Sequence, residues 1–338
     1  MRTVFVMGSG SFGTALAVAM ADCGHTVYLW GWEAPFQAVL RRDRENKQFM
    51  PGTTFPESLT VVDDVAHMPE ADLVLIATPT VGVRGAAALA RGNIKPGAFI
   101  VCSAKGFELG TLKMMTEVIS EENPGVPVVA FSGPSHAEEV SKGQVTAIVA
   151  ASKDPGPADI IQDLFAGSNI RIYSSDDVIG VELGGGLKNV IALAAGIADG
   201  MGLGDNAKAA LITRGITEIA RLGVAMGARY ETFTGLSGIG DLIVTCTSMH
   251  SRNRRCGMLL GRGVSLDVAM VEVGQAVEGV NATTCAYELS VRCGVEMPIT
   301  RQIYRTLKGE ITPAESLHEL LGRPQRHESE AHYLRGQA

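Results

Sequence analysis

The chain has 338 residues, a length that allows two domains with separate hydrophobic cores. Its composition, with 46% hydrophobic and 19% charged residues, is typical of a compact globular protein, and the formal net charge of -7 argues against a nucleic-acid partner, because phosphate backbones require clustered positive charge. The six cysteines show no CxxC or other metal-ligand spacing, which predicts reduced thiols and no structural metal site.

The sequence also predicts a cytoplasmic protein that does not insert into membranes. The apolar run at the start, MRTVFVMGSG, is too short for a signal peptide and lacks a small-residue cleavage pattern. No uninterrupted apolar run reaches the roughly 18 residues that a membrane-spanning helix needs.

The N-terminal segment predicts a strand, a glycine-rich turn and a helix. The apolar residues 4–7 are followed by Gly8, Gly10 and Gly13 in the pattern GxGxxG, and then by the helical sequence TALAVAMADCG. We expect Gly8 to form the tight turn, Gly10 to let the backbone approach a pyrophosphate, and Gly13 to let the helix pack on the strand. With the amide groups at the helix start, this arrangement predicts a dinucleotide-binding site.

The end of the second predicted strand, HTVYLW, indicates which dinucleotide is bound. An acidic residue there would accept a hydrogen bond from the ribose 2'-hydroxyl of NAD, whereas an arginine would suit the 2'-phosphate of NADP. The chain has Trp32 and Glu33 at this point, which favours NAD, although Trp32 could instead stack on the adenine. Arg41 and Arg42 lie nearby and could serve a phosphate or be plain solvated charges.

The segment up to about residue 175 alternates apolar runs with helical patterns. The runs LTVV, DLVLIAT, AFIVCSA, VPVVAFS, TAIVAAS and IRIYSS predict strands, and helices are expected at 81–91, 111–120 and 158–165. This pattern predicts a Rossmann-type, doubly wound and mostly parallel α/β sheet. Polar groups follow three of the strands, at the edge where such folds bind ligands: residues 78–80, Lys105 with Gly106, and residues 132–135.

The stretch 180–204 carries a single cation, Lys188, in an otherwise apolar helical pattern that runs from Val190 onward. Lys188 should therefore lie near the start of a buried helix. Three successive glycines, Gly184 to Gly186, weaken a helix, so we expect close approach of a ligand or of a second helix there. The alternative is that Lys188 extends to solvent and the glycines only pack helices.

Helical patterns dominate after Asp176, which predicts an all-α second domain. We place the boundary near residues 174–178, giving a dinucleotide-binding domain at 1–176, a helical domain at 177–322 and a tail at 323–338.

Two polar segments of the helical domain are candidates for a functional role. Asp241 follows glycine and could be a simple helix cap. Ser251 is expected to cap a helix whose first turn carries Arg252; an arginine there opposes the helix dipole, which favours a bound anion over plain solvation.

Seven motifs together carry a family resemblance. GSGSFGTALA, SAKGFE, SGPSHAEEV, LGGGLKNVIALAAGIADGMGLGDNAKAALITRG, GLSGIGDL, SRNRR and GQAVEG resemble, in order and spacing, those of bacterial-type NAD(P)-dependent sn-glycerol-3-phosphate dehydrogenases, up to about residue 322. The resemblance implies a helical domain like the C-terminal domain of 6-phosphogluconate dehydrogenase. It also implies a homodimer acting on dihydroxyacetone phosphate or glycerol 3-phosphate, and a role in supplying the glycerol phosphate backbone of phospholipids.

The resemblance assigns roles to individual positions. It implies that Lys188 is the catalytic general acid/base. Substrate contacts are implied for Lys105, Gly133, Ser135, Lys188, Asp241, Ser251, Arg252 and Asn253. Cofactor contacts are implied for Gly8, Gly10, Ser11, Phe12, Gly13, Trp32, Lys105, Ala137, Arg252, Ala276 and Glu278. The chain departs from the family pattern at Trp32, where many members carry an arginine, and at His136, where we expect an aromatic or aliphatic residue.

The chemistry of an alcohol dehydrogenation is consistent with this assignment. A free lysine has a pKa of about 10.4, and we expect burial and repulsion from Lys105 and Arg252 to lower the pKa of Lys188, while a substrate phosphate would raise it. Protonated Lys188 is ready to donate a proton to a ketone, so reduction of dihydroxyacetone phosphate should be the easier direction near neutral pH.

Two rival hypotheses for the function remain. One is a β-hydroxyacid dehydrogenase with a carboxylate substrate, and the other is a dinucleotide-binding redox sensor without activity.

Overall fold

The computed structural model describes residues 1–274, 276–325 and 327–328. Within them the first half of the chain forms an eight-stranded sheet of order β3-β2-β1-β4-β5-β6-β7-β8, in which only the β6–β7 pair is antiparallel. The strands are β1 (Thr3–Met7), β2 (Thr26–Trp30), β3 (Leu59–Val62), β4 (Leu73–Ile76), β5 (Phe99–Cys102), β6 (Val128–Ser132), β7 (Thr146–Ala151) and β8 (Ile170–Ser175). The order of the first six is that of a Rossmann fold, so the predicted fold class is confirmed.

Helices cover both faces of the sheet. Val4 and Val6 of β1 pack into one hydrophobic cluster with α1, while Phe5 and Met7 pack into another with α3 and α4, because successive side chains of a strand point to opposite faces. The helices of this half are α1 (Ser11–Asp22), α2 (Ala34–Asp43), α3 (Thr80–Ala90), α4 (Met115–Glu122), α5 (Ala137–Val140) and α6 (Pro157–Leu164), with a 3₁₀ turn at Met68–Glu70.

The helix predicted at 111–120 begins later than expected, at Met115. Residues 105–114, here called the β5–α4 loop, are closed by a bridge between Phe107 and Met114, and Leu112 has a left-handed backbone with φ of 61°. The loop's apolar side chains, Phe107 and Met114, are buried in the hydrophobic cluster of the helical half. Long-range packing therefore overrides the local helical pattern.

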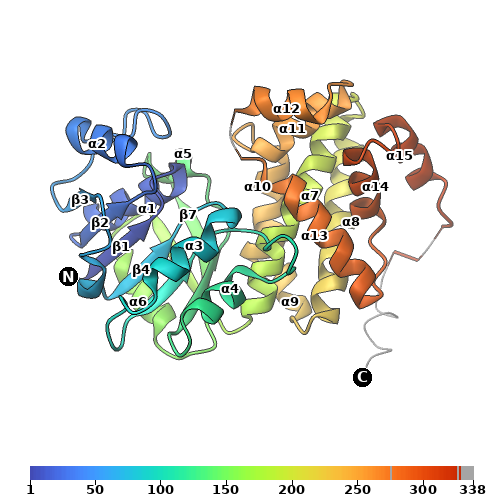
Figure 1. Ribbon diagram of the computed structural model, residues 1–338. Helices are drawn as coiled ribbons and strands as arrows, with labels where there is room; N and C mark the ends of the chain where they lie inside the picture. Colours follow the sequence, from blue (N-terminus) through green and yellow to red (C-terminus); the bar gives the residue numbers. More distant parts are fainter. Residues whose placement is uncertain (275, 326, 329–338) are drawn as a thin grey trace.

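The second half of the described chain contains helices and no strand. They are α7 (Val178–Gly200), α8 (Gly204–Ala225), α9 (Tyr230–Phe233), α10 (Asp241–Thr247), α11 (Arg252–Gly261), α12 (Leu266–Val273), α13 (Glu278–Cys293), α14 (Pro298–Leu307) and α15 (Pro313–Leu321), with a π-helical turn at Leu236–Gly240. Figure 1 shows this half beside the sheet and its helices. The domain boundary near residues 174–178 stays a prediction, and the tail predicted at 323–338 lies mostly outside the described residues.

Helix α7 is the central helix of the second half and begins earlier than expected. The side chain of Asp177 caps it by accepting a hydrogen bond from the backbone N–H of Gly180 at 3.0 Å. Lys188 consequently lies in the middle of the helix and not near its start. By length and composition α7 could cross a membrane, but 89% of its most apolar window is buried inside the protein, as expected for a core helix.

The three glycines before Lys188 allow other segments to approach the backbone of α7. A Cβ atom at Gly184 would lie 2.5 Å from the carbonyl oxygen of Ser237, and one at Gly185 would lie 2.3 Å from Oγ of Ser132. At Gly186 it would lie 3.2 Å from the Cα atom of Gly106. The close neighbours are thus a π-helical turn, a strand end and the β5–α4 loop.

A second set of glycines lets α11 cross α7 at close range. A Cβ atom at Gly196 would lie 2.1 Å from the carbonyl oxygen of Arg254, and one at Gly257 would lie 2.2 Å from that of Leu193. One turn further along, Gly200 faces Gly261 in the same way. This contact fixes the position of the α11 N-terminus relative to Lys188.

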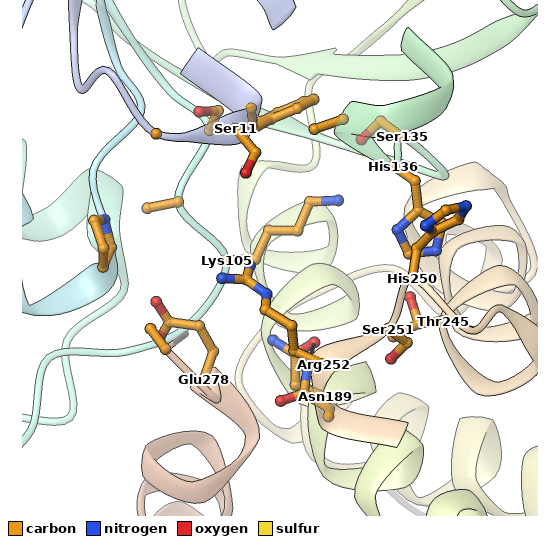
Figure 2. Close-up of a pocket in the computed structure, with 18 of the residues that line it drawn as sticks. Ser11, Lys105, Ser135, His136, Asn189, Thr245, His250, Ser251, Arg252 and Glu278 are labelled. Atoms are coloured by element: carbon orange, nitrogen blue, oxygen red, sulfur yellow. Dashed lines mark hydrogen bonds between the residues drawn. The ribbon is translucent and has the colours of Figure 1, made fainter. Parts of the chain in front are cut away.

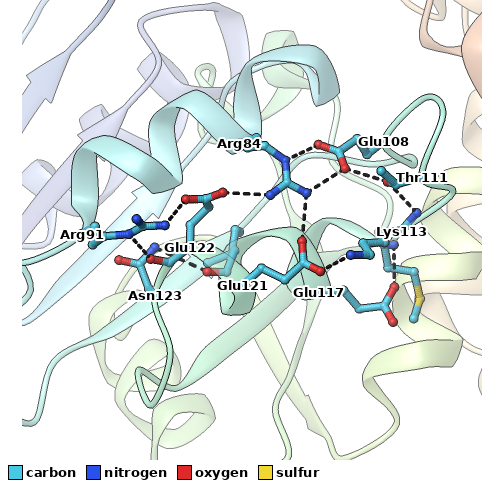
Figure 3. Close-up of polar contacts among 11 residues, drawn as sticks. Arg84, Arg91, Glu108, Thr111, Lys113, Glu117, Glu121, Glu122 and Asn123 are labelled. Carbon is cyan, nitrogen blue, oxygen red and sulfur yellow. Dashed lines mark hydrogen bonds and ion pairs between the residues drawn. The ribbon is translucent and has the colours of Figure 1, made fainter.

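A surface network of ion pairs holds the outer end of the β5–α4 loop (Figure 3). The guanidinium group of Arg84 on α3 pairs with Glu108 in the loop at 2.6 Å, and with Glu121 and Glu122 at the end of α4 at 2.9 and 2.8 Å. Exposed ion pairs contribute little individually, but one arginine shared among three carboxylates orients the segments that carry them.

Replacing Gly257 with alanine tests the α7–α11 contact. We expect Gly257→Ala to lower the free energy of unfolding by about 1–3 kcal/mol or more, because the added methyl group meets backbone that cannot move aside without separating the helices. Thermal unfolding would measure the loss. The control is Gly322→Ala at the exposed end of α15, where φ is -75° and only slight change is expected; equal melting temperatures for the two variants would contradict the prediction.

Candidate active site

A cleft of about 250 Å³ lies where the carboxyl ends of the strands meet the helical half. It brings together most of the residues that the resemblance implicates: Gly10, Ser11, Phe12, Lys105, Ser135, Ala137, Lys188, Ser251, Arg252, Asn253, Ala276 and Glu278. Figure 2 shows Ser11 and Lys105 from the sheet half facing Arg252 and Glu278 from the helical half. The cleft is therefore built from both halves of the chain.

Five of the implicated residues do not line the cleft: Gly8, Gly13, Trp32, Gly133 and Asp241. Gly133 and Asp241 lie behind it, where the carbonyl oxygen of Gly133 and the carboxylate of Asp241 accept hydrogen bonds from Lys105. Both residues thus contact Lys105 instead of the cavity.

The carboxylate of Asp241 joins two lysines at the floor of the cleft. One oxygen accepts from Nζ of Lys188, and the other accepts from Nζ of Lys105 at 2.7 Å. Nζ of Lys188 also donates to Oγ1 of Thr245 at 2.7 Å. Asp241 is 1% exposed, so a bare carboxylate would be costly there, and the interpretation of Asp241 as a simple helix cap does not describe these contacts.

Burial and charge together set the proton affinities of this group. Burial lowers the pKa of Lys188 to about 8, against the opposing effect of Asp241 and with a further lowering by Lys105. Burial raises the pKa of Asp241, but the charges of Lys105 and Lys188 outweigh it and hold the pKa below its ordinary value. Lys188 is thus an ammonium group with a lowered pKa at the cleft wall, the form that can exchange a proton near neutral pH.

The N-terminus of α11 supplies the cationic wall of the cleft. Ser251 caps the helix, its Oγ accepting from the backbone N–H of Arg254 at 3.2 Å, as predicted. Asn253 donates to Asn189 and accepts from the backbone N–H of Gly279, both at 2.9 Å, which fixes this turn against α7 and α13. Within the described residues the Arg252 guanidinium forms no ion pair, so its charge is available to an anion.

The glycine turn after β1 fits the pyrophosphate of a dinucleotide. Gly8 has φ of 124°, and a Cβ atom at Gly13 would lie 1.9 Å from the carbonyl oxygen of Gly8, so the first glycine forms the turn and the third permits helix packing. A Cβ atom at Gly10 would meet no atom within 4 Å, and Gly10 borders the cleft. No side chain caps α1, whose first amide groups are thus free for an anion.

Trp32 and Glu33 follow β2 at the edge of the sheet half. Trp32 is 55% exposed and packs edge-on against Trp30, beside Gly85 of α3. Glu33 is the N-cap residue of α2. Arg41 pairs with Asp63 at 2.6 Å and Arg42 with Asp43 at 2.7 Å, and both arginine side chains are largely exposed.

Thr78 and Pro79 line the cleft, at the strand edge expected to bind ligands, and so does His136, which was noted only as a departure from the family pattern. Sequence reasoning did not single out the remaining cleft residues: Ala77, Ser103, Ala104, Glu138, Asn189, Thr245 and His250. Thr245 lies four residues after Asp241, and on a helix this spacing places both side chains on one face. That spacing was the available signal for Thr245. His250 has no comparable signal, because only the packing of α10 and α11 brings it to the cleft.

Comparison with known proteins agrees with this geometry. Family models for the N-terminus and the C-terminus of NAD-dependent glycerol-3-phosphate dehydrogenase match residues 3–158 and 177–318. The chain belongs to the NAD-dependent glycerol-3-phosphate dehydrogenase family. A member from Moorella thermoacetica, glycerol-3-phosphate dehydrogenase [NAD(P)+], is 48% identical over 98% of both chains, and one of the same name from Desulfitobacterium hafniense is 46% identical over 98% of this chain and 94% of its own.

A solved structure supports the same family membership. The crystal structure of glycerol-3-phosphate dehydrogenase from Coxiella burnetii has a TM-score of 0.91 and 38% identity, and covers 95% of this chain and 99% of its own. Membership of the glycerol-3-phosphate dehydrogenase family makes this protein an NAD(P)-dependent oxidoreductase. Its described residues contain no cluster of three or more His, Cys, Asp or Glu side chains that could hold a metal ion.

Two glycine variants separate cofactor contact from packing. Gly10→Ala should fold normally but weaken NADH binding by roughly 10-fold or more, about 1.4 kcal/mol, because its methyl group projects into open space at the cleft where we expect the pyrophosphate to bind. Gly13→Ala should instead lower the melting temperature, since its methyl group meets the carbonyl oxygen of Gly8. Fluorescence titration with NADH and thermal unfolding measure the two effects, and unchanged NADH affinity in Gly10→Ala would contradict the prediction.

Proposed function

We propose that this protein catalyses reversible hydride transfer between NAD(P)H and dihydroxyacetone phosphate, giving sn-glycerol 3-phosphate. The observation that carries the proposal is the buried Lys188 ammonium group at the wall of a cleft bordered by the dinucleotide turn and by Arg252. Family membership supports the identity of the substrate.

Lys188 is proposed to move the proton of this reaction. During reduction its ammonium group donates a proton to the ketone oxygen, and during oxidation the neutral amine accepts the proton of the hydroxyl group. Asp241 and Thr245 hold the amine in place, since both accept hydrogen bonds from its Nζ atom, and the carboxylate of Asp241 balances its charge. Lys105, tied to the same carboxylate at 2.7 Å, adds positive charge where the substrate oxygen becomes negative.

The phosphate of the substrate is proposed to bind at the N-terminus of α11. Ser251 and Asn253 keep this turn in position, and Arg252 offers a guanidinium group that matches phosphate oxygens. Ser135, also in the cleft, would complete the contacts from the sheet side. A local basic site of this kind is required for an anionic substrate, because the whole chain is acidic.

The cofactor is proposed to bind along the glycine turn. Gly10, Ser11 and Phe12 would hold the pyrophosphate, and Ala137, Ala276 and Glu278 border the same cleft. When bound, the nicotinamide supplies or accepts the hydride. Trp32 and Glu33 at the end of β2, where an arginine would suit the 2'-phosphate, favour NAD over NADP as the preferred cofactor.

We further propose that the enzyme acts as a cytoplasmic homodimer and supplies glycerol phosphate for phospholipid synthesis. The family resemblance supports the dimer and the pathway, and the six free cysteines suit a reducing compartment.

The first test is turnover with matched substrates and cofactors. We expect NADH oxidation with dihydroxyacetone phosphate, slower oxidation of NADPH, and no turnover of 3-hydroxyisobutyrate, which a β-hydroxyacid dehydrogenase would oxidise. Lys188→Ala should bind NADH normally and lose about 10²- to 10⁴-fold in kcat, the usual contribution of a positioned acid/base. A redox sensor would bind NADH without substrate-dependent loss of absorbance, and full turnover by Lys188→Ala would rule out the proton-transfer role.

The second test is pH dependence. Because burial lowers the pKa of Lys188 to about 8, kcat/KM for ketone reduction should fall as the pH rises through about 8, whereas kcat/KM for alcohol oxidation should rise over the same range. Asp241→Asn removes the carboxylate that raises this pKa, so both transitions should move to lower pH. Transitions that stay in place in Asp241→Asn would show that another group is titrating.

A further inference from the structure

Two histidines close one end of the cleft, and the proton-transfer scheme uses neither. His136 comes from the loop between β6 and α5, and His250 from the loop between α10 and α11. Their ring centroids lie 5.8 Å apart, with the planes inclined at 55°. In Figure 2 the pair lies beside Thr245 and Ser251, on the side of the cleft away from Glu278.

His136 carries a polar atom that lacks a partner. Its Nε2 atom is shielded from solvent and forms no hydrogen bond with any described residue. A buried polar group without a hydrogen-bond partner is unfavourable, so a ligand that forms a hydrogen bond with this atom binds better than one that does not. The ring borders the cleft and can turn about its Cβ–Cγ bond, which brings either nitrogen toward a bound molecule.

The charge state of His136 limits what it can bind. Burial and the neighbouring charge of Lys188 lower its pKa, with a further lowering by Lys105 and opposing effects of Glu138 and Asp241. The ring is therefore neutral at pH 7, with one donor and one acceptor. A hydroxyl group, which both donates and accepts, matches a neutral imidazole, whereas a phosphate only accepts and is better matched by Arg252.

The proposed substrate contains one group that the residues already discussed leave without a partner. Its phosphate is assigned to the start of α11 and its carbonyl oxygen to Lys188, which leaves the hydroxyl group at the other end of the three-carbon chain. We propose that His136 binds this hydroxyl group and thereby selects hydroxymethyl ketones over methyl ketones. This inference rests on the proposed function and names a specificity-determining residue for it.

The proposal is tested with two substrates that differ only in this hydroxyl group. Dihydroxyacetone phosphate has it, and hydroxyacetone phosphate has a methyl group in its place. We expect His136→Phe to lower kcat/KM for dihydroxyacetone phosphate by roughly 10-fold or more and to leave kcat/KM for hydroxyacetone phosphate nearly unchanged. His136→Gln, whose amide can occupy the place of Nε2, should restore much of the preference.

Three results separate the possible failures. Equal losses on both substrates in His136→Phe would overturn the proposal, because the residue would then act on something other than the hydroxyl group. Unchanged kinetics on both would overturn it as well. No turnover of dihydroxyacetone phosphate by the unaltered protein would instead refute the proposed function itself, and NADH titration of each variant verifies that the cofactor site remains intact.

Discussion

The structure depends on one buried carboxylate that is shared by two lysines. Asp241 on α10 binds Lys188 of α7 and Lys105 of the β5–α4 loop, and thus joins the helical half to the sheet half at the floor of the cleft. Asp241 and Lys188 are buried, and a charge at either position without the opposite charge beside it would be costly. Burial of the Lys188 amine lowers its pKa, and the charge of Asp241 opposes this change. The resulting pKa of about 8 lets the amine exchange a proton near neutral pH, as the proposed chemistry requires.

Glycine makes this arrangement possible on both sides of α7. Before Lys188, the bare backbone at Gly184 to Gly186 admits the π-helical turn, the end of β6 and the loop that carries Lys105. After Lys188, Gly196 and Gly200 admit the backbone of α11, which carries Arg252. These glycines lower the intrinsic helix stability of α7, and burial against its neighbours stabilises the helix in the folded protein. The glycines allow these close contacts, and the contacts position Lys188.

The cleft is lined by positively charged side chains although the protein as a whole is acidic. Two helix N-termini, those of α1 and α11, border it from opposite halves of the chain, and each offers free amide groups or a guanidinium to an anion. A dinucleotide and a phosphorylated substrate both carry negative charge, so two such ends suit two anionic ligands bound side by side. The hydrogen bonds of Thr80 to Glu278 connect the same two halves at the other side of the cleft.

The local sequence was sufficient to predict most helices and strands and part of the candidate site. Apolar runs between helical patterns predicted the strands of the sheet, and the glycine spacing at Gly8, Gly10 and Gly13 predicted the turn, because strand, turn and helix are adjacent in the chain. Contacts between distant segments could not be derived in this way. The start of α4, the depth of Lys188 within α7 and the meeting of His136 with His250 depend on packing between segments far apart in sequence, and only the tertiary structure decided them.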